Sequence, residues 1–220
     1  NYAALAADLG PDALLPGAGD TEVMLAAFEA WGIERSIDRF VGMFAFALWD
    51  RKERALHLVR DRLGVKPLYF ARCGKKILFG SELRALAAHR PFKTEIDAEA
   101  VSLFLRFGYV PAPRTIWRDA EKLMPGTHIT IDSEGRAARR TYWSLRERIA
   151  TAQAQPFSGS EQEAVTEVER LLRDSVRLRM IADVPIGVLL SGGIDSTTVA
   201  ALAQAESRGR VRTFTIGLPM

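Results

Sequence analysis

The segment from Ser191 to Ser196, which reads Ser-Gly-Gly-Ile-Asp-Ser, contains the residues best suited to bind a ligand. An apolar run from Ile186 to Leu190 precedes it, and an alanine-rich helical pattern follows from Thr197 to Ala205. A strand, a glycine-rich turn and a helix in this order direct several backbone N–H groups and a helix N-terminus at one anion. Gly192 and Gly193 let a phosphate approach the backbone closely. The pattern therefore predicts a phosphate-binding loop.

Asp195 indicates that a metal ion takes part, because a carboxylate beside a phosphate repels it unless a cation lies between them. Mg²⁺ is the hard ion that proteins hold with one or two carboxylates together with phosphate oxygens. Ser191 and Ser196 add hydroxyl donors to the same loop. A Walker A loop is excluded, since Gly193 and Ile194 stand where that motif requires Lys followed by Ser or Thr. A turn that only caps the following helix stays open as the alternative.

The complete pattern, S-G-G-x-D-S between a buried strand and a helix, resembles the pyrophosphate-binding loop of the N-type ATP pyrophosphatases. Those enzymes cleave ATP between its α and β phosphates, adenylate an oxygen of the substrate and let a nitrogen nucleophile displace AMP. The resemblance implies ATP and Mg²⁺ as cofactors, with Asp195 at the metal. It places around the pyrophosphate Ser191, Gly192, Gly193, Asp195 and Ser196.

Composition excludes several classes of protein. The chain has 220 residues, 48% hydrophobic and 26% charged, which is the balance of a globular protein with one large or two modest domains. Its net charge of +3 is small and its arginines are scattered, so we expect no nucleic-acid partner. No apolar run approaches the roughly 18 residues of a membrane span, so we expect no membrane partner. The single cysteine, Cys73, excludes an internal disulfide framework and indicates a cytoplasmic protein.

The N-terminal two-thirds of the chain mix helical and strand patterns. A helix is predicted from Thr21 to Trp31, with Thr21 as its N-cap and Gly32 as its stop. Strands with polar turns between them follow in hairpin order at 41–49, 55–59, 68–72 and 77–80, and a further hairpin begins at 128–131. A helix is also predicted at 81–89, and a further capped helix at Asp97–Phe107. Antiparallel strands with helices beside them predict an α+β layered domain.

The composition changes between Leu145 and Ser160 to Ala, Gln, Ser, Gly and Pro, so we interpret residues 146–160 as an interdomain linker. Ser160 and Glu163 then show the pattern of a capping box. The helix that follows has an apolar stripe, predicted to lie in a core, of Val165, Val168, Leu172 and Val176. Residues 161–220 supply only two strands of a parallel α/β sheet, so we expect the chain to be a fragment of a longer protein.

Further blocks of sequence occur in a characteristic order along the whole chain. They are Gly19-Asp-Thr-Glu-Val23, Gly42-Met-Phe-Ala-Phe46, Arg60-Asp-Arg-Leu-Gly-Val-Lys-Pro-Leu-Tyr69, Ser81-Glu-Leu83, Met124-Pro-Gly126, 184–196 and Phe214-Thr-Ile-Gly-Leu218. In this order they resemble the glutamine-hydrolysing asparagine synthetases of the bacterial type. The resemblance joins a glutaminase-like half to a pyrophosphatase-like half.

This resemblance implies a fold class and domain boundaries. Residues 1–145 would form a type 2 glutamine amidotransferase domain that resembles the N-terminal nucleophile (Ntn) hydrolases, an α+β fold with antiparallel sheets layered α/β/β/α. Residues 161–220 would begin an α/β domain with a parallel sheet, of the N-type ATP pyrophosphatase class. Glutamine, aspartate and ATP are the implied small-molecule substrates, and a homodimer stays open.

The resemblance also implies a mechanism with two sites. In that family a terminal cysteine attacks glutamine with its own α-amino group as base, and ammonia is released. The second domain converts aspartate to β-aspartyl-AMP, from which ammonia displaces AMP. The family cysteine lies upstream of the segment that Asn1-Tyr2 matches, so no catalytic residue is assigned within this chain. Cys73 is no substitute, because it lies in a predicted turn with no histidine nearby.

Few site residues carry over from the family. Asp20 matches the aspartate that receives the α-ammonium of glutamine, and a helix-capping role for Asp20 stays open. Leu189 and Ile216 match strand positions that flank the adenine, and ordinary buried strand residues are the alternative. Arg60 and Asp61 either shape the wall of the active site or form a salt bridge in a loop.

The three histidines, His57, His89 and His128, are scattered without metal-ligand spacing, so we expect surface or strand residues there. Two other functions stay open beside the synthetase. One is a related ligase that adenylates another acid, similar to the β-lactam synthetases or to amidotransferases of polysaccharide clusters. The other is a module that binds nucleotide without turnover.

Overall fold

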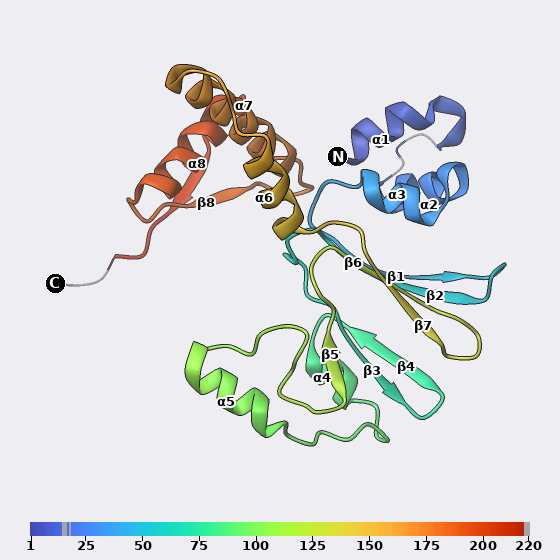
Figure 1. Cartoon of the computed structure of the whole chain (residues 1–220). Coiled ribbons are helices and arrows are strands. Elements are labelled where there is room, and N and C mark those ends of the chain that lie inside the picture. The colour runs from blue at the N-terminus through green and yellow to red at the C-terminus, as the bar shows by residue number, and fades with distance from the viewer. Residues whose placement is uncertain (15–16, 18, 218–220) are drawn as a thin grey trace. The chain divides into compact units, whose positions relative to one another are not determined.

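The computed structural model describes residues 1–14, 17 and 19–217. The chain divides into two compact units, Asn1–Ile149 and Ala150–Met220 (Figure 1). The division falls within the segment predicted as a linker, but that segment is not irregular throughout, because Leu145–Ala154 forms helix α6. Its Ala, Arg, Glu and Gln residues are strong helix formers. The Pro, Gly and Ser residues, which break helices, follow only after it.

Two antiparallel sheets form the centre of the first unit. Its strands are β1 (Ala45–Asp50), β2 (Ala55–Arg60), β3 (Tyr69–Cys73), β4 (Lys76–Gly80), β5 (Ala120–Lys122), β6 (Thr127–Ile131) and β7 (Ala137–Thr141). The four-stranded sheet has the order β1-β2-β6-β7, and the three-stranded sheet has the order β4-β3-β5. The structure confirms the three predicted hairpins, β1-β2, β3-β4 and β6-β7. The sequence did not indicate β5, or that β2 and β3 belong to different sheets.

Helices lie beside both sheets. They are α1 (Tyr2–Leu9), η1 (Pro11–Ala13), α2 (Asp20–Trp31), α3 (Ile33–Arg39), α4 (Leu83–Ala87) and α5 (Ala98–Phe107). Gly32 ends α2 as predicted, with φ of 79°. The predicted N-cap of α2 is wrong, because Gly19 is the cap and Thr21 lies inside the first turn. The Glu22 carboxylate accepts the Gly19 N–H at 3.2 Å, which fixes where the helix starts.

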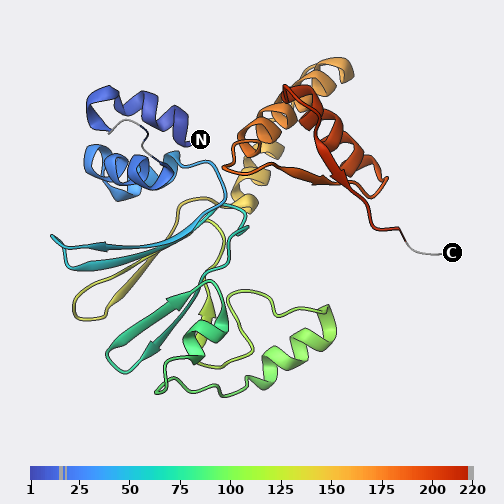
Figure 2. The ribbon, with the colours of Figure 1, turned by 180° about the vertical axis from the view of Figure 1, so that it is seen from behind.

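Three apolar clusters define the layers of this unit. Buried residues of α1 and α2 pack against Phe44 and Phe46 at the start of β1. Leu58 and Ile129 of the four-stranded sheet pack against Phe70 of the three-stranded sheet. The other face of that second sheet is covered by α4. The layers therefore run helix, sheet, sheet, helix, as Figure 2 shows from behind, and the predicted α+β fold class is confirmed.

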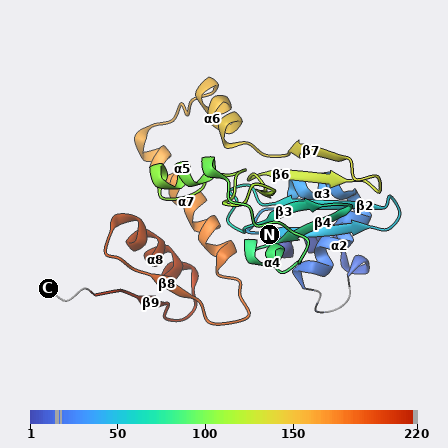
Figure 3. The ribbon, with the colours of Figure 1, turned by 90° about the horizontal axis from the view of Figure 1, so that it is seen from below.

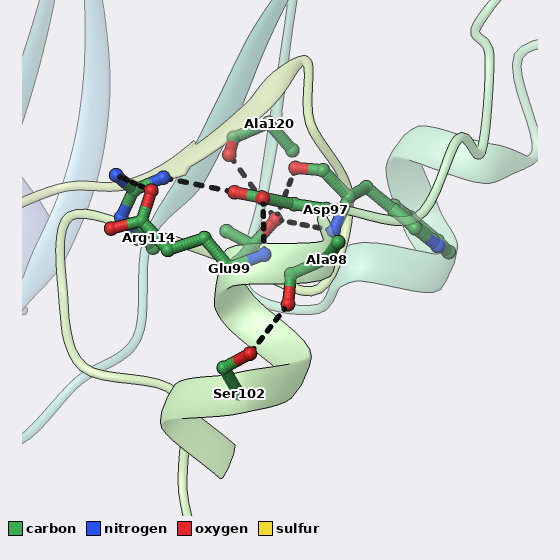
Figure 4. Close-up of polar contacts among 8 residues, drawn as sticks. Asp97, Ala98, Glu99, Ser102, Arg114 and Ala120 are labelled. Atoms are coloured by element: carbon green, nitrogen blue, oxygen red, sulfur yellow. Dashed lines mark hydrogen bonds and ion pairs between the residues drawn. The ribbon is translucent and has the colours of Figure 1, made fainter.

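Helix α5 is tied to the chain that follows it by a polar cluster (Figure 4). Asp97 caps the helix as predicted, since its carboxylate accepts the Glu99 N–H at 3.0 Å. Arg114 donates to Asp97 at 2.9 Å and to Glu99 at 2.6 Å. Thr115 then donates to the Ala120 carbonyl at 3.1 Å, next to β5. These contacts attach α5 to the edge of the second sheet.

The second unit contains α7 (Glu161–Arg179), β8 (Gly187–Leu189), α8 (Ile194–Glu206) and β9 (Arg212–Phe214), with β8 and β9 parallel (Figure 3). The capping box of α7 is confirmed, because Ser160 and Glu163 exchange hydrogen bonds of 2.7 and 3.3 Å. Within this unit the core position predicted for the apolar stripe of α7 is wrong for Val165, Val168 and Leu172, which are exposed, whereas Val176 is half-buried. Val165 and Val168 are 54% and 55% exposed, since α8 and a two-stranded sheet cannot cover a helix of nineteen residues. In the described ranges no helix has the length and hydropathy needed to cross a membrane.

Candidate functional site

The predicted phosphate-binding loop lies between β8 and α8, as the sequence indicated. Gly192 has φ of 85°, a left-handed conformation that favours glycine. Gly193 is the N-cap of α8 with extended backbone angles. The first helical hydrogen bond runs from Thr197 N–H to the Gly193 carbonyl, so the N–H groups of the first turn have no partner within the helix. Backbone donors and a helix N-terminus therefore converge at this turn.

The two serines hold this loop in a closed shape. Ser191 N–H donates to Ser196 Oγ at 3.3 Å, and the two hydroxyl oxygens lie 3.0 Å apart. Ser196 Oγ also donates to the Gly193 carbonyl at 3.1 Å. The Ser191 N–H thus donates to the Ser196 hydroxyl oxygen, and an anionic oxygen could accept the same N–H. The structure therefore brings the predicted loop residues together in one turn, and binding of a phosphate there stays a prediction.

Asp195 lies in the first turn of α8 and is exposed. A carboxylate at this position is favoured by the helix dipole. No cluster of three or more metal-binding side chains occurs within the ranges that the structure describes. One carboxylate beside a loop rich in N–H donors fits Mg²⁺ that is shared with phosphate oxygens, which is how proteins commonly hold this ion.

Leu189 and Ile216, the residues predicted to flank adenine, are 78% and 89% exposed. The alternative, that they are ordinary buried strand residues of a larger sheet, stays open. The carbonyl of Leu190 accepts a hydrogen bond from Thr215 Oγ1 at 2.6 Å, which joins the loop to the end of β9 beside Ile216. Contact with adenine stays a prediction. Leu218 of the last sequence block lies outside the described residues.

Asp20 is the first residue of α2, and its side chain is exposed. Its carboxylate accepts the Thr21 hydroxyl at 3.4 Å. Because Gly19 is the N-cap, the capping role that stayed open for Asp20 is wrong. Val23 and Ala27 anchor the helix in a core cluster. Asp20 is therefore a carboxylate available to a ligand on a well-anchored helix.

Arg60 and Asp61 are buried, at 4% and 1% exposure. A place in the wall of the active site stays a prediction for them. The salt bridge predicted as the alternative is not formed, because within the described chain no ion pair joins the two side chains. Arg60 instead donates at 2.5 to 2.8 Å to the carbonyls of Gly64, Lys66 and Leu123. The Asp61 carboxylate accepts three backbone N–H groups, from Leu63, Val65 and Lys66, at 2.8 to 3.2 Å.

These contacts connect two of the sequence blocks. The Asp61 carbonyl accepts the Gly126 N–H at 2.9 Å, and the Gly126 carbonyl accepts the Tyr142 N–H at 2.9 Å. Tyr142 Oη donates to the Arg60 carbonyl at 2.7 Å. Burial lowers the pKa of Arg60, and the nearby charges of Asp61 and Tyr69 act in the opposite direction. The block 60–69 and the Met-Pro-Gly block therefore meet in one buried structural hub.

Two histidines that sequence reasoning treated as scattered lie side by side. His57 of β2 and His128 of β6 are strand residues, as expected, but both are buried and their rings stack. Strand alternation places both on the helix-facing side of the four-stranded sheet, and the register of β2 against β6, which the sequence does not show, brings them together. Cys73 ends β3 opposite Lys76 and packs half-buried near Leu78.

Comparisons with known proteins agree with these observations. A family model described as a glutamine amidotransferase domain matches residues 1–143, and a model described as asparagine synthase matches residues 167–220. Glutamine-hydrolyzing asparagine synthetase 1 of Bacillus subtilis is 35% identical over 198 residues. Synthetase 3 of the same organism is 33% identical over 202 residues. Each alignment covers 90% of this chain, which spans 30% and 31% of the lengths of these relatives.

Among solved structures, one match is the glutamine phosphoribosylpyrophosphate amidotransferase of B. subtilis, complexed with ADP and GMP. It is 18% identical, with a TM-score of 0.43, and the match covers 98% of this chain and 43% of that one. At this TM-score the likeness carries no conclusion about the site.

Proposed function

The chain belongs to the family of glutamine-hydrolysing asparagine synthetases, and from this premise we propose that it acts in an ATP-dependent ligase that takes nitrogen from glutamine. In finer terms, the reaction makes asparagine from aspartate through β-aspartyl-AMP. The loop from Ser191 to Ser196 is the observation that carries this proposal, because its donors and its single carboxylate match what a magnesium-bound triphosphate requires.

Within the second unit each loop residue has a distinct role. The N–H groups of the first turn of α8 and the hydroxyls of Ser191 and Ser196 bind phosphate oxygens. Asp195 holds Mg²⁺, which neutralises phosphate charge when bound. Leu189 and Ile216 offer exposed apolar surface to the adenine ring.

Within the first unit Asp20 binds glutamine. Its exposed carboxylate receives the α-ammonium group, and the anchored helix α2 fixes its position. A charge pair of this kind orients the substrate, so that its side-chain amide faces one direction for attack. Ammonia released from the amide then serves as the nucleophile in the ligase step.

The test uses Asp195→Ala in the full-length protein. We expect formation of AMP and pyrophosphate to fall by about a hundredfold or more, since the metal loses its protein ligand. Glutamine hydrolysis should stay within about twofold, because Asp20 belongs to the other unit. Asp183→Ala is the matched control, an exposed aspartate of the same unit outside the loop. Normal ATP turnover in Asp195→Ala would refute the proposed site.

A further inference from the structure

Two buried histidines and a threonine form a closed polar triangle on the four-stranded sheet. His57 and His128 are 8% and 2% exposed, and their ring centroids lie 5.1 Å apart. His57 Nδ1 lies 2.9 Å from His128 Nε2. Thr130 Oγ1 lies 3.2 Å from His57 Nδ1 and 3.1 Å from His128 Nε2. No role in the proposed reaction requires this arrangement.

Helix α3 is bound to the sheet right beside this triangle. Arg140 of β7 lies opposite His128 of β6 in register, so both side chains are on the same face of the sheet. From that face Arg140 donates to the two oxygens of Asp38 on α3 at 2.9 and 2.8 Å. Arg62 donates to the Asp38 carbonyl at 2.9 Å. Ile37 of α3 is fully buried.

The contact between the His57 and His128 rings limits how many protons the two rings can carry. His57 Nε2 is buried and has no hydrogen-bond partner among the described residues. A neutral imidazole carries one N–H. Because His57 Nε2 has no acceptor in the described chain, the N–H of His57 lies at Nδ1 and donates to His128 Nε2. A proton added to His57 Nε2 would become a buried donor without an acceptor. A proton added to His128 Nε2 would oppose another N–H across 2.9 Å. Both rings are therefore neutral in this arrangement.

The charged groups around the pair do not compensate an added proton. Arg140 and Arg62 are themselves positive, and Asp38 already binds Arg140. Glu34 of α3 lies 4.0 Å from Arg140. Asp50, at the end of β1, accepts the N–H groups of its own turn at 2.8 and 3.0 Å.

The direction of the pKa shifts agrees with this geometry. Burial lowers the pKa of His57, which Asp50 and Glu34 partly oppose. Burial, followed by the charges of His57 and Arg140, lowers the pKa of His128 to about 4.

We propose that His57, His128 and Thr130 form a proton-controlled latch together with the neighbouring Arg140–Asp38 ion pair. The ion pair holds α3 on the four-stranded sheet while both rings are neutral, and positive charge added to the rings beside Arg140 releases α3 on acidification. Helix α3 is also tied to α2, because Ser36 Oγ bonds the carbonyls of Ala27 and Gly32 at 2.8 and 2.7 Å. Release of α3 would therefore loosen α2. Only the further consequence, weaker glutamine binding through Asp20 on α2, rests on the proposed function.

The sign and size of the effect follow from proton linkage. An opened state has a histidine with an ordinary pKa of about 6.5, and the closed state holds His128 at about 4. The open state binds more protons between these values, so closure weakens as the pH falls below about 6.5. At pH 5 one such site raises the opening equilibrium about thirtyfold over its value at pH 7.5.

Hydrogen exchange of the peptide that covers α3 tests the latch. Exchange is measured at pH 7.5 and 5.0 and corrected for intrinsic rates, with α5 as the reference helix of the same unit. We expect α3 in the wild type to open about thirtyfold more at pH 5.0 than at pH 7.5, beyond any change in α5. In His128→Gln the change should be clearly smaller than in the wild type, because an amide does not titrate and only His57 of the pair still does. His89→Gln, at the one histidine outside the pair, should behave as wild type.

Two results would overturn the latch. One is a change in α3 no larger than that in α5, and the other is the same pH response in His128→Gln as in the wild type. If His128→Gln does not fold, His57→Gln and an NMR titration of the wild-type imidazoles replace it. Two histidines that stay neutral down to about pH 5 support the latch, and ordinary titration of all three between about pH 6 and 7 refutes it. Because none of these readouts involves glutamine or ATP, they are independent of the proposed function.

Discussion

Replacing Gly126 with alanine should destabilise the first unit far more than the same change at Gly74. The two glycines have nearly the same backbone conformation, with φ of 62° and 61°, so both changes share one conformational penalty. Their surroundings differ. A Cβ on Gly126 would lie 2.2 Å from the Trp143 carbonyl oxygen, whereas a Cβ on Gly74 would meet nothing within 4 Å. The pair therefore separates steric conflict from backbone conformation.

The size of the difference follows from what must move. Placing alanine in a left-handed conformation costs about 1 kcal/mol, and this is the whole expected effect at Gly74. At Gly126 the opposing carbonyl belongs to a segment whose own N–H groups bond Gly126 O, at 2.9 Å from Tyr142 and 3.3 Å from Trp143. Relieving the clash disrupts those two bonds, each contributing about 1 kcal/mol. We expect a loss of about 3 kcal/mol or more in the free energy of unfolding.

Urea unfolding followed by tryptophan fluorescence measures this difference in the first unit. The four tryptophans of the chain all belong to that unit, at positions Trp31, Trp49, Trp117 and Trp143. With a slope of about 2 kcal/mol per molar urea, the midpoint should fall by about 1.5 M for Gly126→Ala and about 0.5 M for Gly74→Ala. Equal shifts for the two variants would show that the close approach at Gly126 does not exist in the protein.

Two further predictions concern the hub and the cysteine. Asp61→Ala removes the acceptor of three buried backbone N–H groups, so the same fluorescence assay should show a loss of about 3 to 5 kcal/mol; a loss below about 1 kcal/mol would contradict the hub. Cys73→Ser should leave glutamine hydrolysis by the full-length protein within about twofold, since Cys73 ends β3 and packs against an apolar cluster. A loss by orders of magnitude would mean that Cys73 is the nucleophile.

Local patterns in the sequence sufficed for elements that depend on nearby residues. The helix ending at Gly32, the Asp97 cap and the Ser160–Glu163 capping box were all predicted and confirmed. The strand, glycine turn and helix around 186–205 were predicted as well, because the glycine conformation and the helix start are local properties. The N-cap of α2 was misplaced by two residues, since glycine can cap a helix without leaving a side-chain signal.

Features that depend on distant residues could not be read from the chain. The three residues of β5 form a strand only because β3 pairs with them. For Arg60 and Asp61 the sequence left a salt bridge in a loop open, yet both are buried, and Arg60 reaches the carbonyl of Leu123, 63 residues along the chain. The His57–His128 pair depends on the register of β2 against β6. The segment after Leu145 is rich in Ala and Gln. Its composition indicates a linker, whereas the helix propensity of these residues indicates a helix, so the two signals conflict.

The role of Asp20 tests the central claim, that this chain carries the glutamine side of an amidotransferase, most directly. Steady-state synthesis by Asp20→Ala is measured in the full-length protein with glutamine and, separately, with ammonia as nitrogen donor. Asp119→Ala, an exposed aspartate of the same unit, is the control. We predict that the glutamine-dependent rate falls by about a hundredfold or more, mainly through KM for glutamine, because the ammonium group loses its partner. The ammonia-dependent rate should stay near wild type. An equal fall with both donors, or no fall with either, would contradict the account.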